Sequence, residues 1–217
     1  TRDAFAAKGI HAVTCDLLPS RGSPKNHIIG DVWEVINQGG WDFGIFHPMC
    51  TYLTVSAAWA FNDPDYEKYP GVGYHQRINP QNLYGKDRRD ARDAAVRDFQ
   101  KLMALPFPAV IENPGSNFVS RFVGRPTQII HPYQFGDDAS KATGLWHNHV
   151  ARALNLPKLQ GTSHVPPRWV GKLPRWGNQT DSGQNKLSPS ADRWLERSKT
   201  YPGIAAALGA QYGDWLN

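Results

Sequence analysis

A cysteine and a glutamate each follow a strand-like segment of this sequence, and such a pair can do covalent chemistry. Pro48-Met49-Cys50 comes after the apolar residues 41–46, and Glu112-Asn113-Pro114 ends a second apolar run further along the chain. A thiolate can attack an electrophilic carbon, and a carboxyl group can hold or protonate a heterocycle. We therefore predict that Cys50 and Glu112 are catalytic residues. Taken alone, a buried structural cysteine and a solvent-facing turn glutamate are the simpler interpretations.

Two aspartates precede this pair, and each follows a strand-like segment. Asp16 comes after residues 11–15, and Asp31 comes after a short strand or turn at 27–29. An acidic residue after the second strand of a nucleotide-binding α/β unit can accept hydrogen bonds from ribose hydroxyls. Asp31 can accept from an adenine amino group, or it can simply cap the helix expected at 32–37. The order Asp16, Asp31, Cys50, Glu112 makes the four residues a set.

This order resembles that of the DNA cytosine-5 methyltransferase family. In that family an acidic residue follows strand two, an Asp follows strand three, and Pro-Pro-Cys and Glu-Asn-Val follow later strands. The matching segments are Cys15-Asp16-Leu17, Gly30-Asp31-Val32, Pro48-Met49-Cys50 and Ile111-Glu112-Asn113-Pro114, and Gly85-Lys86-Asp87-Arg88 resembles the stretch leading to the Glu. Most of the chain also resembles small phage or prophage proteins of this superfamily, through residues 47–54, 134–136, 141–146, 188–194 and 197–204.

The resemblance implies a reaction and a cofactor. Cys50 would add to C6 of a cytosine while Glu112 holds the N3/N4 edge, and C5 would take a methyl group from S-adenosylmethionine. A cytosine in duplex DNA would first have to leave the base stack. The residues implied in cofactor binding are Asp16, Leu17, Asp31, Val32 and Pro48.

Departures from the family pattern leave other interpretations open. Met49 stands where the family has its second Pro, no Gln-x-Arg-x-Arg segment is present, and no Gly-rich first loop precedes Thr1. A methyltransferase-like module that binds nucleotides or nucleic acid without catalysis is therefore the alternative. A metal site formed by His147, His149 and His164 is a third interpretation, but no Cys or Glu-x-x-His partner accompanies these residues.

A group of polar and basic residues is predicted to contact nucleic acid. Residues 156–190 are rich in Pro, Gly and polar side chains, and they mix cations with Trp169 and Trp176. Such a mixture can stack bases and grip phosphates, or the tryptophans can merely anchor a loop on the core. The predicted contacts are Asn113, Lys141, Arg168, Lys172 and Arg175.

Composition allows this partner and bears on the compartment. The 217 residues carry a net charge of +5, which permits nucleic acid as a partner without requiring it. Only two cysteines are present, so we expect a reducing, cytoplasmic environment, in the bacterial host if a phage encodes the chain. The sequence has no apolar run long enough to span a membrane, and it does not predict the oligomeric state.

The elements that must position these residues alternate between strands and helices. We predict strands at 11–15, 41–46, 109–111, 127–131 and 141–146, a long helix at 86–105, and C-terminal helices at 192–198 and 203–216. This alternation favours an α/β fold of the Rossmann-like S-adenosylmethionine-dependent methyltransferase type, with a mostly parallel sheet and helices on both faces. Residues 1–155 would form the catalytic core, 156–190 an irregular insertion or recognition segment, and 191–217 helices packed on the core. The long loop 51–85 would be a lid.

Overall fold

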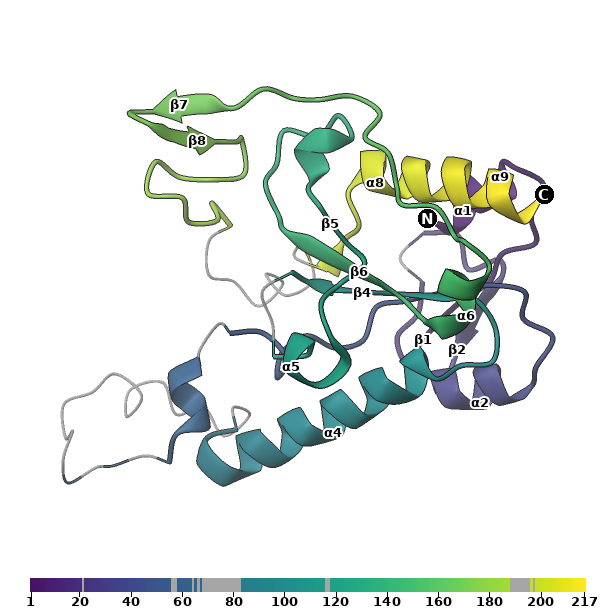
Figure 1. The fold of residues 1–217 in the computed structure, drawn as a ribbon, viewed down its shortest axis with the longest axis horizontal. Helices are drawn as coiled ribbons and strands as arrows, with labels where there is room; N and C mark the ends of the chain where they lie inside the picture. Colours follow the sequence, from purple (N-terminus) through teal and green to yellow (C-terminus); the bar gives the residue numbers. More distant parts are fainter. Residues whose placement is uncertain are drawn as a thin grey trace. The chain divides into compact units, whose positions relative to one another are not determined.

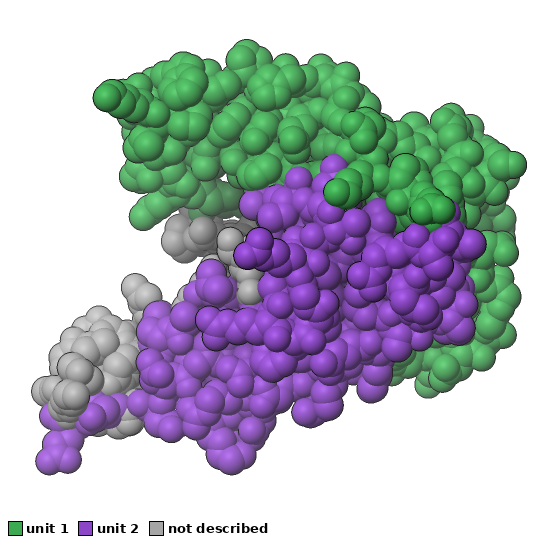
Figure 2. Space-filling model, in the orientation of Figure 1, with its two compact units in different colours: residues 1–42, 130–141, 155–217 green, residues 43–129, 142–154 purple. Residues whose placement is uncertain are grey.

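The chain forms two compact units in a computed structural model that describes residues 1–20, 22–55, 58–63, 65, 67, 83–115, 118–187, 196 and 198–217. Unit 1 comprises Thr1–Asp42, Ile130–Lys141 and Asn155–Asn217, and unit 2 comprises Phe43–Ile129 and Ala142–Leu154 (Figure 2). The residues predicted to be catalytic lie in unit 2, and most of those predicted to bind the cofactor lie in unit 1.

A mixed sheet of four strands forms the centre of unit 2. Its order is β3 (Gly44–Phe46), β4 (Ala109–Pro114), β6 (Thr143–His147) and β5 (Gln128–Ile130) (Figure 1). β3 runs parallel to β4, whereas β6 runs antiparallel to β4. The two inner strands are apolar and buried almost throughout, as expected for strands covered on both faces.

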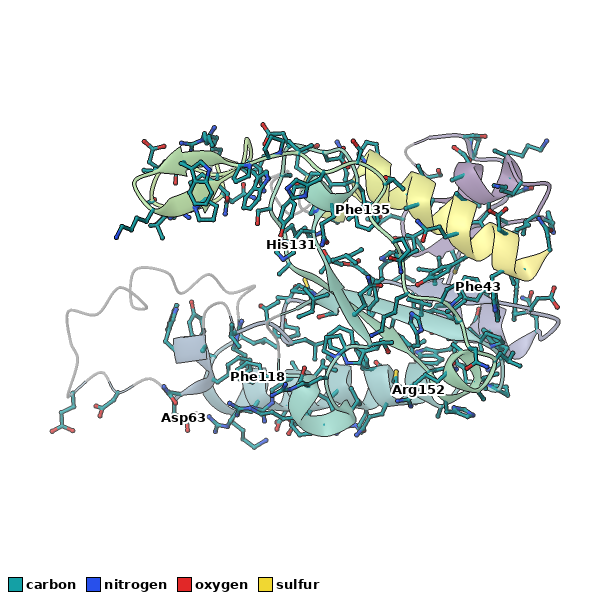
Figure 3. All side chains as sticks on the ribbon, turned by 45° about the horizontal axis from the view of Figure 1, so that its top comes forward. Phe43, Asp63, Phe118, His131, Phe135 and Arg152 are labelled. Atoms are coloured by element: carbon teal, nitrogen blue, oxygen red, sulfur yellow. The ribbon has the colours of Figure 1, made fainter. Side chains whose placement is uncertain are left out.

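The long helix α4 (Gly85–Met103) packs on this sheet. Its apolar residues recur at helical spacing, and Val96, Phe99 and Leu102 are buried. The Phe99 ring meets the Trp146 ring of β6 edge to face, with centroids 5.3 Å apart. The helix begins where Asp63, labelled in Figure 3, accepts a hydrogen bond from the Lys86 amide.

Short helices complete unit 2. They are η1 (Ala58–Phe61), α5 (Ser120–Val123) and α6 (His149–Ala153). Buried Asn148 caps α6 by accepting from the Ala151 amide, and the same oxygen accepts from the Ala109 amide at the start of β4. One amide side chain thereby joins the helix to the sheet.

Unit 1 contains a parallel strand pair and a continuous C-terminal helical segment. The pair is β1 (Thr14–Asp16) and β2 (His27–Ile29), followed by α2 (Val32–Asn37). The helical segment runs through α8 (Pro202–Ala207), the π-helical turn η3 (Leu208–Tyr212) and α9 (Gly213–Leu216). It packs against α1 (Arg2–Ala6) at Gly209, where a Cβ atom would clash with Ala4.

Two further elements of unit 1 lie in separate parts of the chain. They are η2 (Pro132–Gln134) and an antiparallel hairpin of β7 (Arg168–Val170) and β8 (Leu173–Arg175). The hairpin lies inside residues 156–190, which the sequence predicted to be an irregular insertion or a small recognition segment.

The predicted fold class is wrong. The structure has short strands in mixed and antiparallel sheets, not the mostly parallel sheet of a Rossmann-like methyltransferase fold. Parallel neighbours need a long crossover, usually a helix. Within the described residues between β4 and β6, the only helices are the short α5 and η2, on either side of strand β5, and β6 runs antiparallel to β4. β1 and β2 also pair apart from the main sheet.

Several individual elements were predicted correctly. The helix at 86–105 is α4, the strand at 141–146 is β6, and the helix at 203–216 is α8 with η3 and α9. The helix predicted at 192–198 and most of the predicted lid, including Tyr66, Tyr69 and Tyr74, lie outside the described residues. Among the residues that are described, no helix combines the length and apolarity needed to cross a membrane.

Candidate functional site

The carboxyl ends of β3 and β4 bring polar side chains together in unit 2. Phe46 and Ile111 are register partners, so His47 and Glu112 follow on adjacent parallel strands. His47 Nδ1 lies 2.7 Å from Glu112 Oε2, and the Glu112 side chain is 22 % exposed. The Glu112 carboxylate is thus held at the sheet edge while still reaching solvent.

A second link between the strands comes from Asn113. This residue is buried, and its side-chain amide donates to the Pro48 carbonyl at 3.1 Å. Pro48 lies two residues before Cys50, so the bond fixes the backbone that leads to the cysteine. A buried amide that loses such a partner is costly, which makes this contact a structural constraint on the loop.

Cys50 lies at the start of a tight turn and is exposed with a free thiol. Its carbonyl accepts from the amides of Leu53 and Thr54 at 3.0 and 3.1 Å. Leu53 is fully buried, and its carbonyl accepts from the Phe118 amide at 2.7 Å. The buried leucine therefore anchors the turn and leaves the thiol at the surface.

Arg88 of α4 supports the same turn from inside unit 2. It is 7 % exposed, its Nη2 lies 3.4 Å from the Thr51 carbonyl, and its Nη1 lies 3.3 Å from the Leu83 carbonyl. Its guanidinium carbon lies 4.9 Å from the centre of the Phe61 ring and 5.4 Å from that of Tyr52. Its Nε is buried and has no hydrogen-bond acceptor within the described part of the chain. A buried cation therefore contacts the backbone of Thr51, the residue after Cys50.

A neighbouring ion pair fixes the start of α4. Arg89 donates to both carboxylate oxygens of Asp63, at 3.1 and 3.2 Å. These hydrogen bonds hold the pKa of the Asp63 carboxyl below its usual range. Asp63 is exposed, so the pair orients the helix start but adds little stability.

In unit 1, Asp16 is the last residue of β1, and Asp31 lies two residues after the end of the parallel strand β2. Asp16 Oδ1 accepts from the Leu18 amide, and Asp31 Oδ1 accepts from the Trp33 amide, both at 2.9 Å. Asp31 is therefore the N-cap of α2, the simpler of the two roles that the sequence allowed. Both aspartates are exposed, and the Gly30 amide joins the strand ends by donating to the Asp16 carbonyl.

Apolar side chains surround these carboxylates. Leu17, Leu18 and Ile29 are 74 %, 51 % and 61 % exposed, and Val32 is half-buried in the first turn of α2. Cys15 donates to the Gly30 carbonyl, and burial, with the carboxylates of Asp16 and Asp31, raises the pKa of its thiol. Carboxylates beside exposed apolar groups fit a ligand with both hydroxyls and a flat apolar ring.

The residues predicted to contact nucleic acid have different surroundings. Asn113 is buried in unit 2 and holds the Cys50 loop, and Lys141 is half-buried in unit 1. Arg168 pairs with Asp181 at 2.7 Å, and Arg175 donates to the Asp181 carbonyl at 3.0 Å. Both arginines thus hold their own hairpin to the segment that follows it.

The remaining residues of the hairpin are open to solvent. Lys172 lies in the turn, is exposed, and makes no hydrogen bond or ion pair with any described residue. Trp169 is 65 % exposed, whereas the Trp176 ring stacks on Tyr133 with centroids 4.1 Å apart. Of the two roles considered for the tryptophans, anchoring the loop applies to Trp176. Trp169 does not anchor the loop.

The three histidines of the metal interpretation are not brought together as a group. His147 and His149 belong to unit 2, where His147 is buried, and His164 belongs to unit 1. Across the described ranges, no group of three or more His, Cys, Asp or Glu side chains is placed to hold a metal ion.

Comparisons with protein-family models, curated proteins and solved structures found no match to this chain. The function must therefore be argued from the geometry of the two strand ends and from the residues themselves.

Sequence reasoning missed the roles of two residues at the Cys50 edge. His47 was visible only as the residue before Pro48, and Arg88 only as part of Gly85-Lys86-Asp87-Arg88. A polar residue directly after an apolar strand run is a usable signal for His47, because Glu112 follows the neighbouring run in the same way. Arg88 gives no such signal, because a lysine or arginine in a helix is usually solvated.

Proposed function

We propose that this protein is a cytosine C5 methyltransferase that acts on DNA through a covalent adduct with Cys50. The observation that carries the proposal is the edge formed by β3 and β4. An exposed free thiol follows β3, a carboxylate lies in the C-terminal half of β4, and His47 and Asn113 link the two strands. Nucleophile and acid then reach one substrate ring from adjacent strands.

The chemistry assigns one step to each side chain. The Cys50 thiolate adds to C6 of cytosine, and the electron pair moves through the ring to C5. Glu112 hydrogen-bonds the N3/N4 edge and protonates N3, which removes the developing negative charge. C5 would then take the methyl group as the S–CH3 bond of the sulfonium donor breaks and the donor leaves as a neutral thioether. A base would remove the C5 proton, the Cys50 sulfur would leave as thiolate, and N3 would return its proton to Glu112.

His47 is the positioning residue for this carboxyl group. The contact of its Nδ1 with Glu112 Oε2 holds one carboxyl oxygen in place. The orientation of the whole carboxyl group is thereby fixed. Arg88 has a comparable positioning role behind Cys50, because it hydrogen-bonds the Thr51 carbonyl next to the nucleophile. Neither residue needs to contact the substrate to affect the rate.

The cofactor that fits this chemistry is S-adenosylmethionine, which would supply the methyl group as an electrophile on sulfur. Asp16 would accept from its ribose hydroxyls and Asp31 from its adenine amino group. Leu17 and Val32 would line the adenine ring. The support in unit 1 is the pairing of two exposed carboxylates with exposed Leu17, Leu18 and Ile29.

The decisive experiment traps the adduct. Single-stranded and duplex DNA containing 5-fluorocytosine is incubated with protein and S-adenosylmethionine, then run on a denaturing gel. Fluorine at C5 cannot leave as a proton, so the Cys50 thioether persists in the wild type. Glu112→Gln keeps the shape of the side chain without the acid, and it should slow trapping by about 10²–10⁴-fold.

A matched cysteine variant separates reaction from binding. Cys50→Ser should form no adduct, whereas Cys15→Ser should trap DNA like the wild type. A wild-type protein that binds DNA but never forms the adduct would favour the non-catalytic binding module. That alternative is supported by Asp31, whose side chain already caps α2.

A further inference from the structure

The β7–β8 hairpin of unit 1 has two faces that differ in what covers them. Register partners share a face, so Arg168 and Arg175 lie on one face with Val170 and Leu173, and Trp169 and Pro174 lie on the other. The arginine face is covered by residues 179–183, because Arg168 pairs with Asp181 and also donates to the Gln179 carbonyl. Among the residues that the structure describes, no such bonds cover the Trp169 face, and Trp169 is 65 % exposed.

The hairpin is held firmly at its base. Trp176, directly after β8, stacks on Tyr133, and its indole nitrogen donates to the Val165 carbonyl at 3.0 Å. The Gly177 amide donates to Asp138, and Asn178 exchanges two hydrogen bonds with the Ser140 backbone. The hairpin that carries Trp169 is thus firmly attached at its base, and it lies at the end of unit 1 remote from α9 (Figure 1).

The turn of the hairpin carries a cation three residues after Trp169. Gly171 has a φ of +61° and is the first of two loop residues, an arrangement found in type II′ turns. Lys172 is the second loop residue and makes no hydrogen bond or ion pair with any residue that the structure describes. Residues 155–187 hold five Lys or Arg and one Asp, so this segment has a net charge of +4 in a chain of +5.

We propose that the hairpin binds single-stranded DNA, with Trp169 stacking on an unpaired base and Lys172 contacting the adjacent phosphate. The inference rests on the proposed function for its choice of DNA as substrate. An exposed indole on a firmly attached hairpin offers a ring face to any base, and the positive segment favours a polyanion. Arg168 and Arg175 are assigned to holding the hairpin rather than to the DNA.

The test is a titration of a fluorescein-labelled single-stranded oligodeoxynucleotide of about 20 nucleotides, longer than one such site. Trp169→Ala should weaken binding about tenfold, while Trp169→Phe should restore most of the affinity. Leu173→Ser is the matched control, because Leu173 is 54 % exposed on the opposite face of the same hairpin. It should leave the affinity unchanged.

Salt dependence tests the lysine. Lys172→Gln should reduce the slope of log Kd against log salt by about 0.7, the value for one lost phosphate contact on a single strand. Lys158→Gln, an exposed lysine of the same segment, is the control and should leave the slope as in the wild type. Circular dichroism melting of each variant confirms that the hairpin changes leave the fold intact.

Three results would overturn the inference. These are no binding of the oligonucleotide by the wild type, an affinity that Trp169→Ala does not change, or tighter duplex binding that is independent of Trp169. The proposed function can fail separately. Binding that depends on Trp169 without a 5-fluorocytosine adduct would contradict the methyltransferase proposal and support the hairpin as a DNA site. An adduct with binding that is independent of Trp169 would support the methyltransferase proposal and contradict the hairpin site.

Discussion

Two pairs of parallel strands end in polar residues in this chain, and their ends are organised differently. At β3–β4, side chains bond across the strands, since His47 reaches Glu112 and Asn113 reaches the Pro48 carbonyl. At β1–β2, Asp16 and Asp31 instead accept from amides two residues further along their own segments. Cross-strand bonds fix the distance between two functional groups, whereas local bonds fix only the turn on which each group lies.

The two cysteines differ in their exposure and in their position relative to the strand end. Cys15 lies inside β1, donates to the Gly30 carbonyl, and has a raised thiol pKa. Cys50 lies beyond the end of β3 in a turn anchored by buried Leu53, and its thiol is exposed. A thiol needs both access and a thiolate form to act as a nucleophile, so position relative to the strand end decides which cysteine can react.

The largest expected effect on activity comes from replacing each cysteine in turn by serine. Cys50→Ser should abolish methyl transfer, a loss of at least about 10³-fold, because a hydroxyl does not ionise near neutral pH. Cys15→Ser should retain transfer, because Cys15 is not the proposed nucleophile and a serine hydroxyl can keep its hydrogen bond to the Gly30 carbonyl. Incorporation of labelled methyl groups into DNA measures both variants. An equal loss of methyl transfer in the two variants would contradict the assignment of Cys50, rather than Cys15, as the nucleophile.

The cross-strand link predicts the next largest effect. Asn113→Ala removes the bond to the partly buried Pro48 carbonyl, which should lower the free energy of unfolding by about 1–3 kcal/mol. Asn148→Ala should cost at least as much, because this buried asparagine of unit 2 donates to the Leu105 and Phe107 carbonyls and accepts from the Ala109 and Ala151 amides.

Activity distinguishes the two asparagines. At a temperature where both variants are folded, only Asn113→Ala should also slow adduct trapping, because only Asn113 holds the loop that leads to Cys50. Urea unfolding and trapping rates measure the two effects. Equal trapping rates in both variants would show that Asn113 serves stability alone.

The polar residues near the carboxyl ends of β3 and β4 could be predicted from the sequence. The strand directions of the sheet that carries them could not. The apolar run before Pro48-Met49-Cys50 ends where β3 ends. The strand predicted at 109–111 instead continues through Glu112-Asn113-Pro114, because antiparallel β6 pairs with these residues. The antiparallel pairing of β6 with β4 depends on residues far apart in the chain, which a single sequence does not reveal. His47 and Arg88 were missed for the same reason, since their partners are distant in sequence.

The β1–β2 end predicts a smaller effect that separates capping from cofactor binding. Asp31→Ala should lower stability by about 1 kcal/mol through loss of the α2 cap, whereas Asp31→Asn keeps a good cap and removes the charge. S-adenosylhomocysteine should raise the Tm of the wild type, and neither variant should show that rise. An undiminished rise in Asp31→Asn would restrict this residue to its capping role.

The smallest effect concerns the pH dependence of Cys15. Burial, followed by the nearby carboxylates of Asp16 and Asp31, raises the pKa of this thiol in the folded chain. The unfolded chain therefore loses the proton first, and the stability from Cys15 is complete below about pH 8.5 and is lost as the pH rises through the folded pKa. In a Cys50→Ser background, where Cys15 is the only thiol, alkylation by iodoacetamide should begin at higher pH in the native protein than in urea. Identical pH profiles in both states would show that the β1 thiol is as accessible and as acidic as an unfolded one, and the contrast between the two cysteines would then rest on geometry at β3–β4 alone.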